Sequence, residues 1–161
     1  MKKILCCLLV VLFLFSLTAC GTASPKEFTS NGMTVTLTDA FKEASYEGYT
    51  VCYESKDVAV FVLKESFSIQ EGFGDLSVDD YAELVYTANA SKNPSAVAKE
   101  DGLTVMEYSF LNEQANKTYS YYSAMFKGTD AFWLVQFACV KENYEAKRDT
   151  FVEWAKTVEF A

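Results

Sequence analysis

The first regular pattern after the apolar N-terminus is an alternation of apolar and polar residues. From Met33 to Leu37, every second side chain is apolar and threonines lie between, which is the period of a half-buried strand. Two further β-rich runs, "GYTVCYES" (48–55) and "DVAVFVLKES" (57–66), meet across "SKD" and predict a hairpin. In the second run both faces are apolar, so we expect that strand to be central in a sheet covered on both sides.

The period becomes helical after the loop "SFSIQEGFGDL" (66–76). Ser77 suits the N-cap of a helix, with Asp79 and Asp80 in the first turn. Asn93-Pro94 predicts the end of this helical region, because proline disfavours the α conformation of the residue before it. The apolar residues at helical spacing are Tyr81, Leu84, Val85 and Ala88.

Three more β-rich runs and a second amphipathic segment complete the chain. The runs are "GLTVMEYSFL" (102–111), "TYSYYSAMF" (118–126) and "AFWLVQFACV" (131–140), and the last is apolar on both faces. The segment 143–160 predicts a helix with an apolar stripe of Tyr144, Phe151, Trp154, Ala155 and Val158. The order β-β-β-α-β-β-β-α predicts an α+β fold, with a mostly antiparallel sheet of about six strands flanked by two helices.

The N-terminus has the layout of an export signal. Lys2 and Lys3 precede an apolar run, residues 4–19, which is shorter than the roughly 20 residues that a membrane-spanning helix needs. Its end, Leu17-Thr18-Ala19-Cys20, resembles the lipobox of bacterial lipoproteins. The resemblance implies a diacylglyceryl group on the Cys20 sulfur, cleavage before it, and a lipid anchor on the extracytoplasmic face of the cell membrane. The alternatives are an ordinary signal peptide cut elsewhere and a retained membrane anchor.

These observations divide the chain into three parts. Residues 1–19 are the expected lipoprotein signal peptide, residues 20–31 a lipidated cysteine with a flexible tether, and residues 32–161 a single domain. Without the signal peptide, 12 basic and 22 acidic side chains leave a net charge of −10. So acidic a chain is unsuited to nucleic acid, whose phosphates attract basic surfaces, and should resist adsorption to anionic lipid.

The residue types that usually carry catalysis are scarce. The sequence has no histidine and no CxxC pair, so neither a metal site nor a cofactor is expected. No Ser-x-x-Lys pair occurs after the signal peptide, and capping explains Asp79 and Asp80 better than catalysis. The acidic loop 70–80 matches no EF-hand spacing, which favours a solvated loop over a calcium site. We therefore expect no enzymatic activity.

Cys52 and Cys139 are the two remaining cysteines, and both lie in predicted strands. A disulfide between them would close a long loop, which is compatible with an extracytoplasmic location. Alternatively, both are small buried apolar residues.

Three sets of aromatic residues are candidates for binding. Phe73, between Gly72 and Gly74, lies either in the core or at a loop tip that contacts a partner. Tyr119 and Tyr121 share one face of their strand and would form an amphipathic interaction surface if no helix covers it. As an alternative to a protein partner, a small ligand could bind in a pocket lined by Tyr108, Trp133 and neighbouring aromatics.

The order of elements, the lipobox and the closing "FVEWAKTVEF" (151–160) resemble the PsbP/DcrB superfamily over residues 31–161. This resemblance implies a sandwich of helices and sheet, and a role as an adaptor or binding subunit, but it transfers no functional residue. The hypothesis is a membrane-anchored, extracytoplasmic lipoprotein that acts as a non-enzymatic protein-interaction module. Its expected partners are the membrane, through the lipid anchor, and a protein of the cell envelope; the alternative is a lipoprotein that binds a small ligand.

Overall fold

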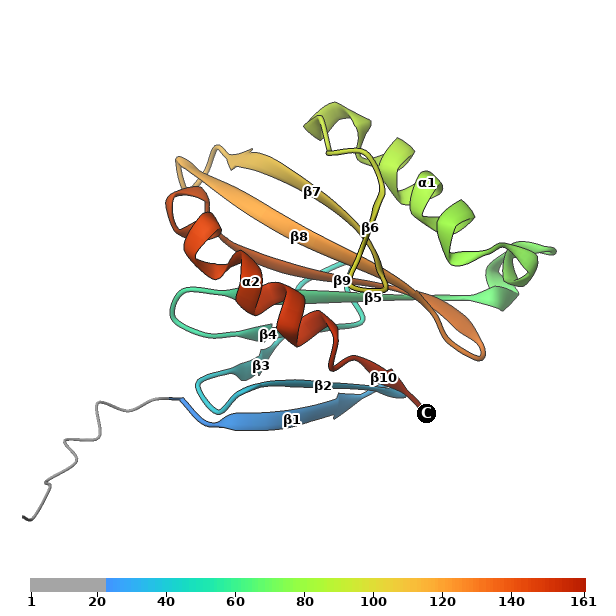
Figure 1. The fold of residues 1–161 in the computed structure, drawn as a ribbon, viewed down its shortest axis with the longest axis horizontal. Coiled ribbons are helices and arrows are strands. Elements are labelled where there is room, and N and C mark those ends of the chain that lie inside the picture. Colours follow the sequence, from blue (N-terminus) through green and yellow to red (C-terminus); the bar gives the residue numbers. More distant parts are fainter. Residues whose placement is uncertain (1–22) are drawn as a thin grey trace, which may run out of the picture.

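A computed structural model describes residues 23–161, which form ten strands and two α-helices in an α+β arrangement (Figure 1). The predicted signal peptide and Cys20 lie outside the described residues. The helices are α1 (Val78–Ala88) and α2 (Tyr144–Ala155). The strands are β1 (Pro25–Ser30), β2 (Met33–Thr38), β3 (Lys42–Ala44), β4 (Val51–Glu54), β5 (Ala59–Ser66), β6 (Ala98–Glu100), β7 (Leu103–Asn112), β8 (Lys117–Lys127), β9 (Ala131–Val140) and β10 (Glu159–Phe160).

Seven strands form one antiparallel sheet in the order β3-β4-β5-β9-β8-β7-β6. The prediction that β5 and β9 are central is confirmed, because each pairs on both sides and β9 is buried along nearly its whole length. The predicted hairpin of β4 and β5 is also confirmed, with Val51 opposite Val62. The sequence did not predict the short strands β3 and β6, whose three residues are too few to show a period. The predicted helix over 143–160 is wrong at its end, because α2 stops at Ala155 and residues 159–160 form β10.

The second sheet has three strands in the order β1-β2-β10. Residues 25–30, which the sequence analysis assigned to a flexible tether, instead form β1 and pair with β2 from Pro25 opposite Thr38 to Ser30 opposite Met33. Asn31 and Gly32 connect the two strands with φ angles of 54° and 89°. Two successive positive φ values are typical of the two-residue hairpin turn that Asn-Gly favours.

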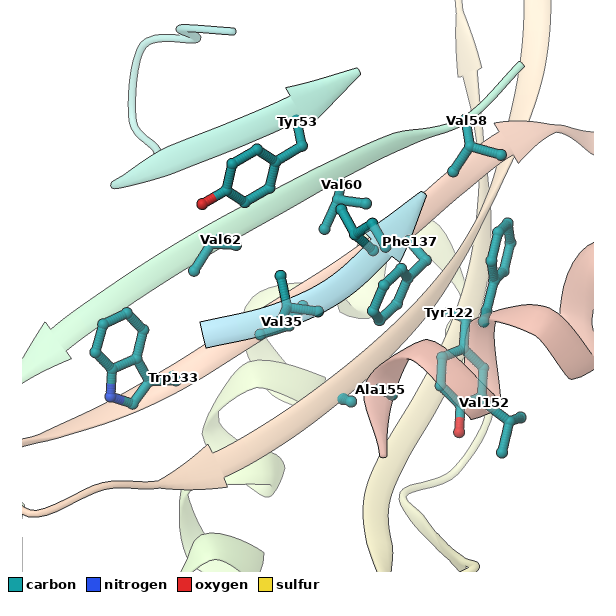
Figure 2. Close-up of a cluster of buried hydrophobic side chains, with 14 of the residues drawn as sticks. Val35, Tyr53, Val58, Val60, Val62, Tyr122, Trp133, Phe137, Val152 and Ala155 are labelled. Atoms are coloured by element: carbon teal, nitrogen blue, oxygen red, sulfur yellow. The ribbon is translucent and has the colours of Figure 1, made fainter. Parts of the chain in front are cut away.

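The three-stranded sheet and α2 cover one face of the seven-stranded sheet. Figure 2 shows Val35 of β2 facing Val60 and Val62 of β5, while Val152 of α2 lies near Tyr122 of β8. These side chains belong to the larger hydrophobic core and are almost completely buried. Alternate residues of β9 point into this core, namely Trp133, Val135, Phe137 and Cys139.

Helix α1 covers part of the opposite face. The predicted cap is confirmed, because the Ser77 hydroxyl accepts a hydrogen bond from the Asp80 amide while the Asp80 carboxylate accepts one from the Ser77 amide. Tyr81 and Val85 pack into a second core, but Leu84 is 51% exposed and is not part of it. No helix of the described residues is both long enough and apolar enough to span a membrane.

Candidate aromatic cleft

The part of the α1-side face that α1 does not reach carries an open cleft with a volume of about 800 Å³. It lies over β5, β8 and β9 at the end of the molecule that holds the β4–β5 turn and the tip of the β7–β8 hairpin. Its aromatic lining residues are Tyr46, Tyr49, Phe61, Tyr119 and Tyr121, and the charged ones are Glu54, Lys56, Asp57, Lys117 and Glu142. We call this feature the aromatic cleft.

Four rings of the aromatic cleft, those of Tyr46, Tyr49, Phe61 and Tyr121, form a continuous row. Tyr46 and Tyr49, from the β3–β4 connection, pack on Phe61 with ring centroids 5.5 and 4.9 Å away. Phe61 lies 6.4 Å from Tyr121, which in turn stacks on Tyr108. Because Tyr46 is 43% exposed and Tyr49 37% exposed, the outer part of the row is accessible to solvent.

A carboxylate lies at the outer end of this row. The Tyr46 hydroxyl donates a hydrogen bond to Glu54, and this bond raises the pKa of the tyrosine because deprotonation would break it beside a negative charge. Burial raises the pKa of Tyr49 as well. Tyr46 and Tyr49 therefore remain neutral hydrogen-bonding groups at physiological pH, suited to binding rather than to proton transfer.

The structure places Tyr119 and Tyr121 together in the aromatic cleft, on the face that the sequence analysis assigned to them. Phe73 lies elsewhere, in the short 3₁₀ helix η2 (Phe73–Asp75), with its ring 5.2 Å from Phe132 and 6.2 Å from Tyr81. Of the two alternatives for Phe73, the structure therefore shows the core one, with its partly buried ring packed against the core under α1. Phe73 therefore does not form one surface with Tyr119 and Tyr121.

Tyr46, Tyr49 and Phe61 were not predicted as site residues from the sequence. Phe61 was assigned to a central strand, and it is indeed on one, but it lies at the end of β5 that α1 does not reach, whereas Leu63 on the same side packs against the core under α1. The two tyrosines lie in the segment "SYEGYT", which has no regular period. The spacing of these two aromatics around Gly48 was the only signal available.

The prediction of a ligand pocket lined by Tyr108 and Trp133 is wrong. Trp133 points into the larger core, whereas Tyr108 belongs to the core under α1, so the two side chains lie on opposite faces of the sheet. Both are almost fully buried. The Tyr108 hydroxyl accepts a hydrogen bond from the Gln136 amide at 2.9 Å, and the same amide donates to Ser123 at 3.0 Å.

The two cysteines of the described residues are free thiols, so the disulfide alternative does not hold in this structure. Cys139 points into the larger core. On β4, Val51 and Tyr53 also point into that core, and Cys52 lies between them in the sequence. Alternation along β4 therefore places the two sulfurs on opposite faces of the sheet. Burial raises the pKa of both thiols, as expected of unreactive structural cysteines.

The densest group of charges lies between α2 and β7, away from the aromatic cleft. Arg148 donates two hydrogen bonds to Glu100, both at 2.8 Å, and two to Glu107, at 2.7 and 3.1 Å. Tyr144 donates to Glu107 at 2.5 Å and Tyr122 to Glu100 at 3.2 Å. Because the arginine donors and both carboxylates are engaged with each other, this network fastens α2 to the sheet.

The described residues contain no group of three or more metal-ligating side chains. Among their carboxyl groups, those with a clearly shifted pKa are Asp79, Asp80 and Glu100, and each is shifted downward by hydrogen bonds. A general acid at neutral pH needs the opposite shift. The chemistry available at the aromatic cleft is stacking, hydrogen bonding and charge pairing.

No family model matches the chain, and no curated protein matches it by sequence.

Solved structures nevertheless share its fold. Cyanobacterial PsbP from Synechocystis has a TM-score of 0.56 and 10% identity, over 92% of this chain and 99% of that one. The Ran-binding protein Mog1p of Saccharomyces cerevisiae has a TM-score of 0.52 and 9% identity, over 86% of this chain and 96% of its own. A protein of Bacteroides thetaiotaomicron has a TM-score of 0.53 and 15% identity, over 84% of this chain and 48% of its own. These similarities confirm the expected PsbP-like fold.

Proposed function

We propose that this protein is an extracytoplasmic lipoprotein, anchored through Cys20, whose domain binds a partner protein in the aromatic cleft without chemical conversion. The observation that carries the binding role is the row of rings from Tyr46 through Phe61 to Tyr121 on an uncovered sheet face. Tyrosine supplies apolar area and a hydroxyl at low conformational cost, and it is enriched where proteins bind each other.

The shape of the cleft favours a polypeptide over a small ligand. Pockets for small molecules bury most of the ligand surface, whereas this cleft is open to solvent. Its rim alternates in charge, with Lys56 next to Asp57 and with Glu54 and Lys117 nearby, which suits a segment that has both polar and apolar side chains. Mog1p, which has the same fold, is a Ran-binding protein, so the fold supports protein binding in at least that case.

The test is site-specific photocrosslinking in the bacterial host. A photoreactive phenylalanine analogue at Tyr119 should yield a discrete crosslinked protein, and the Phe61→Ala substitution in the same chain should abolish it. The matched control carries the analogue at Leu84, which is also exposed but lies on α1. If crosslinking from Leu84 gave the same product in equal yield, the aromatic cleft would not be the binding site.

Anchoring through Cys20 has its own test. Metabolic labelling with a clickable fatty acid should label the full chain, and Cys20→Ser should remove the label and release the protein from the membrane fraction. Labelling that survives the substitution would contradict the proposed anchor.

A further inference from the structure

The fold begins very close to the proposed anchor. The Ser24 amide donates a hydrogen bond to the Asp39 carboxylate at 3.0 Å, and the Asp39 amide donates to the Ser24 carbonyl at 2.8 Å. Strand β1 follows at once from Pro25. Only residues 21–23 therefore separate Cys20 from the first fixed residue. Four Cα–Cα steps span at most about 14 Å, compared with roughly 35 Å for the eleven-residue tether that the sequence predicted.

A second, smaller hollow of about 310 Å³ lies where the chain enters the fold, with Ala23 on its rim. It is formed by the β2–β3 turn, the β4–β5 turn and the flank of α2 that carries Lys147, Thr150 and Trp154. Its charged residues are Lys56, Lys147 and Asp57, so lysines outnumber acids here although the whole chain has a net charge of −8. Hydroxyl groups add further hydrogen-bonding capacity, namely those of Thr38, Ser55 and Thr150.

We propose that this lysine-bearing hollow docks on the phosphate groups of the bilayer that holds the anchor. The proposal rests on the lipidation of Cys20 proposed above. A linker this short keeps the β4–β5 turn at the membrane surface, so a weak contact acts at high effective concentration. Lysine and phosphate are complementary in charge, and Lys56 is exposed in the turn.

The net negative charge of the domain does not oppose this orientation strongly. Charges more than about 8 Å apart are largely screened at physiological ionic strength, so the residues nearest the bilayer dominate. Helix α1 and the loop before it, which carry acidic residues such as Glu71, Asp75 and Glu83, follow the end of β5 opposite the β4–β5 turn. The local charge of the hollow, set by Lys56, Lys147 and Asp57, therefore differs in sign from the net charge of the chain.

The orientation has a consequence for the aromatic cleft. The hollow and the cleft share Ser55, Lys56, Asp57 and Val58, the residues of the β4–β5 turn and its flanks. The cleft therefore opens beside the bilayer, and its protein partner would bind there at the level of the membrane surface.

The experiment uses the full, lipidated chain in vesicles of phosphatidylcholine and phosphatidylglycerol that contain a lipid with a nitroxide-labelled headgroup. A fluorophore is attached through Asp57→Cys in the β4–β5 turn or through Ile69→Cys, which is 60% exposed at the far end of β5. Both native thiols of the described residues are buried, so the introduced cysteine is the one that reacts. We expect much stronger quenching at position 57 than at position 69.

Two further variants separate lysine contact from simple tethering. Lys56→Gln and Lys147→Gln should each lower the ratio of docked to undocked protein by roughly fivefold, because a lysine near an anionic surface contributes about 1 kcal/mol. Lys127→Gln, at the end of β8, is the control and should leave the ratio unchanged. An insertion of about 20 Gly/Ser residues after Ala23 should remove the difference between positions 57 and 69, because it relaxes the tether.

The two proposals fail in different ways. Equal quenching at positions 57 and 69 in protein that floats with the vesicles would overturn the docking surface and leave the anchor intact. Quenching that persists at position 57 in both lysine variants would also overturn it, because the lysines would then contribute nothing. Protein that does not float with the vesicles at all would contradict the lipid anchor itself.

Discussion

The ring of Tyr121 stacks on the ring of Tyr108, with centroids 4.7 Å apart and planes 11° from parallel. Tyr108 lies in the core under α1, whereas Tyr121 lines the open aromatic cleft. This pair therefore joins the covered and the uncovered parts of one sheet face. Changes at Tyr121 should affect both the stability of the domain and the surface that it offers to a partner.

We expect Tyr121→Ala to lower the free energy of unfolding by about 2 kcal/mol, because a half-buried ring and its stacking partner lose contact. Tyr121→Phe keeps the ring and should leave stability within about 0.5 kcal/mol of the parent. Urea denaturation of residues 23–161 measures both values. An equal loss in the two variants would show that the hydroxyl, rather than the stack, stabilises this position.

Arg148 is expected to be the most sensitive charged position of the domain. Arg148→Met would leave Glu100 and Glu107 facing each other without a counter-charge and should destabilise by roughly 1 to 3 kcal/mol, since partial exposure screens the loss. Arg148→Lys keeps the charge but loses the planar fork, so its loss should be intermediate. Thermal unfolding of the three proteins gives the order. A lysine variant as stable as the parent would mean that charge alone matters.

The same network predicts a dependence of stability on pH. Hydrogen bonds from Arg148 hold the pKa of Glu100 below its usual range. The folded state therefore binds fewer protons than the unfolded chain, whose Glu pKa is about 4.3. This contribution is complete above that value and is lost as pH falls through the lower folded pKa. Urea midpoints between about pH 3 and pH 6 should fall less in Arg148→Met than in the parent. Parallel profiles for the two proteins would contradict this assignment.

The sequence predicted the strands that have a clear period. The six predicted β-rich runs became β2, β4, β5, β7, β8 and β9, and two-sided apolarity correctly identified β5 and β9 as central. The helix start at Ser77 was predictable because capping depends on local residues. Strand β1 was missed, although Asn31-Gly32 ahead of the alternating β2 is a strong hairpin signal, because its small polar residues suggested a tether.

The candidate site was only half predictable. Periodicity placed Tyr119 and Tyr121 on one face, but whether a helix covers that face depends on where α1 crosses the sheet, which no local pattern encodes. Tyr108 and Trp133 failed as a pair for a related reason. Each lies on its own strand, and the face that each occupies follows from strand register, which is set by distant pairing.

The two cysteines give a simple test of the sheet geometry. Because Cys52 and Cys139 are 1% and 2% exposed, a thiol reagent should modify neither in the native domain and both in denaturant. Their raised pKa values act in the same direction, since the thiolate is the reactive form. A reducing agent should leave the unfolding temperature unchanged. A fall of several degrees on reduction would indicate a disulfide and a different strand arrangement.

The turn between β1 and β2 controls how much free chain separates the domain from its proposed anchor. Gly32 has a φ of 89° with no atom within 4 Å of an added Cβ, so Gly32→Ala introduces backbone strain without a clash. We expect a loss of roughly 1 to 3 kcal/mol, the cost of a non-glycine residue at such angles. Asn31→Gly at the neighbouring position, where φ is 54°, is the matched control and should be nearly neutral. Hydrogen exchange of the β1 amides should accelerate in Gly32→Ala before the rest of the domain responds, because β1 pairs with β2 alone. If the β1 amides and those of β9 accelerated equally, the small sheet would unfold only with the whole domain, and the distance between fold and anchor would be fixed.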